Sequence, residues 1–152
     1  MVAAPPLYAL LAALVVGAIA LGGGIYETAL IDRSWPRKPE IIQPERGGIN
    51  RAMFWGPIHS VFELALLLAL RLAWAAPQAR LCIIAAVIIH FATRVWSFVY
   101  FIPLAMRFQD VEKASQLHED KKYQWVRLSP WRVLLEAAVL LMLATAIVKL
   151  IG

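Results

Sequence analysis

The chain has 152 residues, of which 61% are hydrophobic and 16% charged, and its net charge is +5. A typical soluble domain is roughly 25% charged, and one of this length has too much surface for its volume to hide so many apolar side chains. The composition therefore excludes an ordinary soluble domain. The one cysteine, Cys82, excludes an intrachain disulfide and a thiolate metal cage.

Four long apolar runs follow one another along the chain. They cover about residues 7–31, 53–76, 79–106 and 130–151. A helix rises about 1.5 Å per residue and the hydrocarbon core of a bilayer is about 30 Å thick, so roughly 20 residues cross it. We expect Pro77 in the turn after the second run, a kink at Pro103, and a helix start at Ser129 and Pro130. The sequence predicts an all-α protein, an antiparallel four-helix transmembrane bundle that forms one domain over residues 1–152.

A cleaved signal peptide is an alternative explanation of the first run alone. The segment Ala18-Ile19-Ala20 resembles a cleavage site. However, no basic segment precedes the run, and the apolar residues continue past this site. We therefore interpret the first run as a membrane span.

The two long segments between the spans differ in character. Residues 32–52 contain three prolines and two adjacent glycines, which is typical of an irregular loop that folds over a bundle. Residues 107–122 lack proline and glycine and mix charges, which predicts a solvated helix that continues the third span. Together these segments predict a cytoplasmic loop and helix cap.

Basic residues are distributed unevenly between the two sides of the predicted bundle. The long segments carry Arg33, Arg37, Lys38, Arg46, Arg51, Arg107, Lys113, Lys121, Lys122, Arg127 and Arg132, and the other side carries Arg71, Arg80 and Lys149. Because Lys and Arg favour cytoplasmic loops, this ratio of eleven to three predicts that both termini lie outside. The expected aromatic belt consists of Trp35, Trp55, Trp125 and Trp131 on the cytoplasmic side and Trp74 on the other. We expect a bacterial cytoplasmic membrane protein whose basic residues contact anionic lipids and not nucleic acid.

Ionisable residues lie inside every predicted span, where each costs at least ~2.5–3.5 kcal/mol. The six residues are Glu27, His59, Glu63, His90, Arg94 and Glu136. At about 1.5 Å per residue from the cytoplasmic end of each span, five of them lie roughly 6–18 Å deep and His90 lies ~24 Å deep. The concentration in one half of the bilayer predicts a polar pocket that opens toward the cytoplasm.

Helical spacing places these residues on shared faces. His59 and Glu63 are four residues apart and therefore stack on one face of the second span. The same spacing relates His90 and Arg94 in the third span. Glu27 follows three adjacent glycines, which favour either close packing or a cavity beside its carboxylate.

Each of these residues also has a purely structural explanation. Glu63 and Arg94 lie at matching depth and form a plain ion pair in this view. Glu136 pairs with Arg132 one turn earlier, or extends to the interface. In this view His59 is a hydrogen-bonded histidine at the interface, and His90 is a neutral buried histidine bonded to a carbonyl. A single ion pair, however, explains two of the six residues and leaves four.

The residue types favour a small-molecule site with acid–base chemistry. His59 or Glu27 supplies a general base, and Arg94 suits an anionic or oxygen-rich substrate. Glu63 orients Arg94, and Glu136 completes the wall of the site. The predicted catalytic residues are therefore His59, Glu27, Glu63, Arg94 and Glu136.

A metal ion, iron or copper, is an alternative occupant of the site. The candidate ligands are His59, Glu63, Glu27 and Glu136. Bundle proteins hold metal pairs with Glu from two helices and Glu-x-x-His from two others, whereas the second span here has His-x-x-x-Glu and the fourth has no such pair. Haem is disfavoured because the estimated depths of His59 and His90 differ by about 15 Å.

Three functions agree with this sequence. The first is a membrane-embedded oxidoreductase or isomerase that acts on a lipophilic substrate, with an intramembrane site open to the cytoplasmic side. The second is a non-catalytic accessory subunit of a larger membrane complex. The third is a proton-coupled small transporter, which would need to oligomerise because the chain has no internal repeat. Expected partners are membrane lipids, a small lipophilic substrate, and copies of the chain or other subunits.

Three segments resemble those of small four-span bacterial membrane proteins. They are residues 24–27 (GIYE), 54–59 (FWGPIH) and 94–103 (RVWSFVYFIP). In size and span count the chain is also similar to anthrone-oxygenase-like membrane proteins. The resemblance implies a multi-pass membrane protein and carries no residue role with it.

Overall fold

The computed structural model describes residues 4–152, and helices make up almost all of this range, with no strand in it. Four helical segments are long and apolar enough to cross a membrane. They are Pro5–Ser34, Ala52–Leu72, Pro77–Gln109 and Glu119–Ile151. The all-helical class and the four apolar helices are thereby confirmed, and they indicate a multi-pass membrane protein.

Two of the four segments contain a π-helical turn. The first consists of α1 (Ala4–Tyr26), the π turn η1 (Glu27–Ile31) and α2 (Asp32–Ser34). The third consists of α4 (Pro77–Trp96), the π turn η4 (Ser97–Phe101) and α5 (Ile102–Gln109). The remaining elements are α3 (Ala52–Leu72), α6 (Val111–Ser115), α7 (Glu119–Ile151) and the short 3-10 turns η2 (Pro39–Ile42) and η3 (Pro44–Arg46).

The irregularity expected at Pro103 is the π turn that precedes it. The ring of a proline inside a helix clashes with the carbonyl four residues earlier. In η4 the extra residue per turn widens the helix at this place, and the Ile102 N–H donates to the Ser97 carbonyl five residues back. Ser97 and Phe101 of this widened turn are buried inside the bundle.

The helix start predicted at Ser129 and Pro130 is wrong, whereas the predicted end at about residue 151 agrees with the end of α7. Helix α7 begins at Glu119, ten residues before Ser129, and Pro130 lies inside it. The acidic first turn, Glu119 and Asp120, suits the positive end of the helix dipole. The helix therefore starts where the charges favour it and passes through the proline.

Other boundaries also differ from the predicted ones. Helix α3 ends at Leu72 and Pro77 occupies the first turn of α4, so the proline starts a helix and does not form the turn after one. The third segment ends at Gln109 and does not continue to residue 122. Asp110 interrupts it as the N-cap of α6, where it accepts hydrogen bonds from the Lys113 backbone and ammonium. The side-chain bond from Lys113 holds the pKa of the Asp110 carboxyl below its ordinary value.

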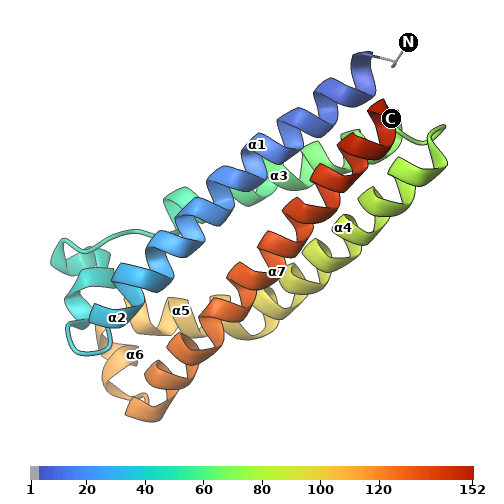
Figure 1. The fold of residues 1–152 in the computed structure, drawn as a ribbon. Helices are drawn as coiled ribbons and strands as arrows, with labels where there is room; N and C mark the ends of the chain where they lie inside the picture. Colours follow the sequence, from blue (N-terminus) through green and yellow to red (C-terminus); the bar gives the residue numbers. More distant parts are fainter. Residues whose placement is uncertain (1–3) are drawn as a thin grey trace.

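The four long segments lie side by side, each running opposite to the one before it (Figure 1). The start of α1 and the end of α7 lie at one end, and α2, α5 and α6 lie at the other, which we call the distal end. Helix α1 packs against both α3 and α7, and α7 packs against α4. Helix α3 contacts α4 much less than it contacts α1, so the bundle is loosest between α3 and the α4–α5 segment.

Two hydrophobic clusters form the core. One runs along the bundle and includes the fully buried Leu10, Phe62, Ile83 and Leu143. The other, the distal cluster, consists of Trp35, Ile42, Phe101, Phe108 and Trp125. The ring of Trp35 lies 4.9 Å from Phe108 and 5.8 Å from Trp125 between centroids. The aromatic rings thus join the loop after α2 to η4, α5 and the start of α7.

The predicted tryptophan belt is therefore wrong for three of its members, Trp35, Trp55 and Trp125. Trp35 and Trp125 are 0% and 2% exposed and fill the distal cluster, because sequence position alone does not say which way an indole faces. Trp131 and Trp74 are exposed at 58% and 54%, as interface residues would be. Trp55 points into the bundle, where it takes part in the site described below.

Two glycines of α1 offer a test of how the bundle packs. A Cβ atom added at Gly17 would lie 2.5 Å from Leu140 and 2.8 Å from the buried ring of Phe62, whereas one added at Gly22 would meet nothing within 4 Å. We expect Gly17→Ala to lower the free energy of unfolding by about 1–3 kcal/mol, because the ring of Phe62 is fully buried and would have to shift. Gly22→Ala is the matched control and should change stability by less than about 1 kcal/mol. Thermal unfolding in detergent measures both, and equal midpoints for the two variants would contradict the packing at Gly17.

Candidate functional site

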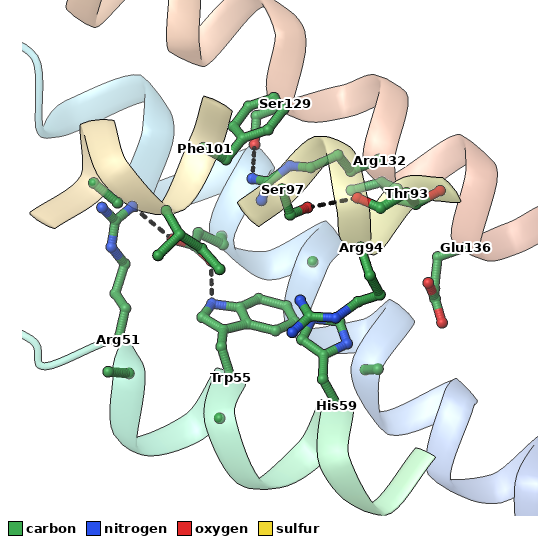
Figure 2. Close-up of a pocket in the computed structure, with 18 of the residues that line it drawn as sticks. Arg51, Trp55, His59, Thr93, Arg94, Ser97, Phe101, Ser129, Arg132 and Glu136 are labelled. Atoms are coloured by element: carbon green, nitrogen blue, oxygen red, sulfur yellow. Dashed lines mark hydrogen bonds and ion pairs between the residues drawn. The ribbon is translucent and has the colours of Figure 1, made fainter. Parts of the chain in front are cut away.

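A cavity of about 400 Å³ lies toward the distal end of the bundle. Its walls come from all four long segments, including both π turns (Figure 2). One part of the lining is polar and carries Glu27, Arg51, His59, Arg94, Arg132 and Glu136. Four of the five predicted catalytic residues therefore line one space, and Glu63 lies behind Arg94.

Glu27 is the most extensively bonded acid of the site. It begins the π turn η1, and its carboxylate accepts 2.8 Å from Arg51 Nη1 and 2.6 Å from Trp55 Nε1. Both Glu27 and Arg51 are only 8% exposed, so this is a buried ion pair between the first span and the start of α3. A Cβ added at Gly24 would lie 3.3 Å from Val133 and 3.9 Å from Trp55, so the small residue lets the indole approach.

One ring nitrogen of His59 has no hydrogen-bond partner within the chain. Its ring stacks on Trp55, with centroids 5.3 Å apart and planes at 22°. Its Nδ1 atom is buried and has no hydrogen-bond partner. Because Trp55 is itself fixed by Glu27, the imidazole is held from one face while its nitrogen remains available. An imidazole in this setting suits proton transfer to or from a bound molecule.

Glu63 and Arg94 form the ion pair that their matching depth predicts. Arg94 Nε lies 2.9 Å from Glu63 Oε1, and the guanidinium also lies over Phe98 at 4.7 Å from the ring centroid. Glu63 thus orients Arg94, as expected, and joins α3 to α4. Arg94 lines the cavity together with His59 (Figure 2).

His90 lies between two carboxylates from different helices. The ring is 0% exposed, with Nε2 3.8 Å from Glu63 Oε1 and Nδ1 3.4 Å from Glu136 Oε2. The aromatic ring of Phe62 packs against it at 4.9 Å. Two carboxylates therefore face this histidine, and the carbonyl partner considered for it from the sequence is not what the structure places there. Glu136 correspondingly faces His90, while Arg132 donates to Ser129.

The depth estimate that separated the two histidines is wrong. The rings of His59 and His90 have centroids 6.0 Å apart, in place of the expected 15 Å. The estimate counted residues from the distal end of each helix, but these ends are not level. Helix α5 and the start of α7 extend further toward the distal end than the start of α3 does (Figure 1). The argument against haem that rested on this difference in depth therefore does not hold. The ring nitrogens of His90 nevertheless face Glu136 and Glu63, an arrangement unlike that of an axial ligand.

The proposed metal ligands are not arranged as a metal site. Within residues 4–152, no group of three or more His, Cys, Asp or Glu side chains is placed to hold a metal ion. Glu27 is bound by Arg51 and Trp55, and Glu63 is bound by Arg94. A cation near these carboxylates would have to displace the arginines. The residues therefore do not fit an iron or copper centre.

Arg132 is the residue of the site that sequence reasoning missed. Its Nη2 donates 2.8 Å to Ser129 Oγ, and its guanidinium lies 3.8 Å from the centroid of the Phe101 ring. Its Nε is buried without a partner. The sequence grouped Arg132 with the loop charges because the fourth span was expected to begin at Ser129. The acidic residues Glu119 and Asp120, which favour a helix start, are the sequence signal that would have placed Arg132 well inside the fourth helix.

No protein-family profile, no curated protein and no solved structure matches the chain.

The Glu27–Arg51 pair generates a prediction on stability. Removing one partner leaves the other charge buried, so Glu27→Ala and Arg51→Ala should each cost about 3–5 kcal/mol of unfolding free energy. The double variant should cost clearly less than the two single losses together. Lys113→Ala, which removes an exposed ion pair with Asp110, is the control and should unfold like the wild type. Additive losses in a thermal or denaturant series would show that the two side chains do not stabilise each other.

Proposed function

We propose that the chain is a multi-pass protein of the bacterial cytoplasmic membrane, an antiparallel four-helix bundle with both termini outside. The charge bias of the segments supports this orientation. The distal end would then form a cap in the cytoplasm, with Trp35 and Trp125 in its core. The resemblance to small four-span bacterial proteins, and to anthrone-oxygenase-like proteins in size and span count, agrees with this proposal.

The cavity would bind a lipophilic small molecule. One observation carries this: a space of about 400 Å³, large enough for a small ligand, is walled by apolar residues along one part and by convergent polar groups along another. The polar part includes His59 Nδ1 and Arg132 Nε, buried atoms that have no partner within the chain. Buried polar atoms normally have partners, so a bound molecule accounts for both.

The chemistry that these residues support best is an isomerisation. His59 would take a proton from a carbon that lies between a carbonyl and a carbon–carbon double bond. It would return the proton to the far carbon of that double bond, so that the double bond moves next to the carbonyl. The enolate oxygen formed in between would be stabilised by Arg94 or Arg132, which line the same cavity. This reaction is redox-neutral, so the base and the two cations suffice and no co-reactant is required.

One observation favours a second function, proton-coupled transport. Glu63, His90 and Glu136 form a short series of titratable groups across three helices, and His90 in its middle is fully buried. Such series carry protons in pumps and transporters. Proton flux into vesicles that contain the chain, lost in His90→Gln, would support this alternative over an enzyme.

Filling the cavity tests whether a molecule binds there. Ala105 lines the cavity, whereas Ala92 on the same segment is exposed and does not line it. We expect a lipophilic compound to co-purify with the wild type and with Ala92→Phe, and about tenfold less of it with Ala105→Phe, because the new ring occupies its place. Solvent extraction and mass spectrometry measure the amount per protein. Equal amounts in all three preparations would assign the compound to the lipid-facing surface.

A variant of His59 tests the reaction. His59→Gln keeps a polar side chain of similar size but cannot take the proton, and loss of a general base typically slows a reaction about 10²–10⁴-fold. We expect the wild type to co-purify with two isomers of equal mass and His59→Gln with one. His118→Gln, which changes an exposed histidine, is the matched control. Unchanged isomer ratios in His59→Gln would refute acid–base catalysis by this residue while leaving the binding site intact.

A further inference from the structure

The cavity has a side opening between α3 and the η4–α5 segment. Helix α3 presents only small residues to it, Ala52, Gly56 and Ser60, which are spaced four apart, line the cavity and are exposed. A Cβ atom added at Gly56 would meet nothing within 4 Å, so the space in front of this residue is open. The looseness of the bundle between these two segments therefore leads directly into the cavity.

The opposite edge of the opening is apolar. Phe98, Ile102 and Met106 follow one another at four-residue spacing and also line the cavity. Phe98 is 58% exposed and Met106 is 65% exposed. Both edges belong to segments long and apolar enough to span a membrane. In the proposed bilayer orientation, lipid chains would therefore border the opening. An alkyl chain is the occupant that such a passage accepts.

Two guanidinium groups, those of Arg51 and Arg132, line the inner, polar part of the cavity. Arg51 and Arg132 lie 5.0 and 5.2 Å from the centroid of the same Trp125 ring. Glu27 pairs with Arg51, but no carboxylate lies within 4 Å of Arg132 among residues 4–152. Buried N–H groups on both side chains, Arg51 Nη2 and Arg132 Nε, have no partner. This part of the cavity therefore has one more cation than its ion pairs use.

Planar guanidinium donors match the oxygens of a carboxylate or a phosphate, which accept two hydrogen bonds side by side. Glu27 and Asp32 act on the charge of Arg132 only from beyond 4 Å, since neither carboxylate forms an ion pair with it. The buried N–H groups of Arg132 and Arg51 therefore remain without an acceptor. An oxyanion from outside the chain would accept from both, and more strongly than a neutral head.

We propose that the cavity takes a single-chain anionic amphiphile, laterally from the bilayer. Its carboxylate or phosphate head would be held by Arg132 and Arg51, and its chain would leave between α3 and η4–α5 over Gly56 and Met106. This inference rests on the proposed function, since it names the class of molecule that the same cavity binds. It adds the charge of the head and the route of entry.

The test is equilibrium binding to the full chain in nanodiscs of a zwitterionic lipid, with empty nanodiscs as background. Three tritiated or ³²P-labelled probes are compared: dodecyl phosphate, dodecanol and inorganic phosphate. Since a hydrogen bond to a charged group contributes more than a neutral one, dodecyl phosphate should bind at least about tenfold more tightly than dodecanol. Inorganic phosphate, which lacks the chain, should bind more weakly than either amphiphile.

Two variants test the head and the passage separately. Arg132→Gln should remove the preference for dodecyl phosphate over dodecanol. Gly56→Phe should weaken binding of both amphiphiles about tenfold or more, because the ring fills the opening without a clash inside the chain. Gly22→Phe is the matched control, since a Cβ there also meets nothing and the residue does not line the cavity. It should bind like the wild type.

The outcomes separate this inference from the proposed function. Equal affinity for dodecanol and dodecyl phosphate would overturn the anionic head and leave a lipophilic site in place. Tight binding of inorganic phosphate alone, unaffected by Gly56→Phe, would overturn lateral entry. Saturable binding of none of the probes would overturn both the inference and the proposed binding function.

Discussion

The carboxylate of Glu27 holds three parts of the molecule in place. It is bonded to Arg51 at the start of α3 and to Trp55 one turn later, while its own backbone opens the π turn η1. Trp55 in turn supports the ring of His59. In a low-dielectric interior a buried carboxylate without partners is very costly, so this acid fixes the start of α3 against the first span. The hydrogen bonds that the Glu27 carboxylate requires therefore also fix the positions of Arg51, Trp55 and His59 at the site.

The remaining polar pairs act in the same way at other contacts between helices. Arg94 and Glu63 join α3 to α4, and His90 lies between Glu63 and Glu136 of α7. Apolar contacts alone do not fix helix positions strongly in lipid, because lipid chains are as apolar as the side chains they replace. The polar contacts therefore set which faces meet. Between the distal half of α3 and the η4–α5 segment such polar contacts are missing. There the helices lie further apart, and the cavity occupies the space between them.

The sequence predicted the spans well and the interior less well, for identifiable reasons. Long apolar runs are set by membrane thickness, so four spans and the Glu63–Arg94 pair followed from counting. The start of α7 did not, because a proline at residue 130 looks like a helix start yet lies inside a helix. That error removed Arg132 from the site. The distance between His59 and His90 failed because helix ends at the distal side are not level, which is a tertiary property that no single span encodes.

The distal cluster explains how two arginines remain inside a mostly apolar bundle. Arg51 lies over Trp125, and Arg132 lies over both Trp125 and Phe101, at 3.8 Å from the latter ring centroid. The faces of aromatic rings attract cations, and this attraction grows when water is absent. It acts on the flat faces of the guanidinium and leaves the N–H edges free. The rings therefore stabilise the charge without using its hydrogen bonds, so Arg51 Nη2 and Arg132 Nε stay buried without a partner. Arg51 and Arg94 also lie over aromatic rings but pair in addition with Glu27 and Glu63, and these ion pairs join two helices. Arg132 has aromatic support and no ion pair among residues 4–152, so aromatic contacts in place of a carboxylate leave its Nε free.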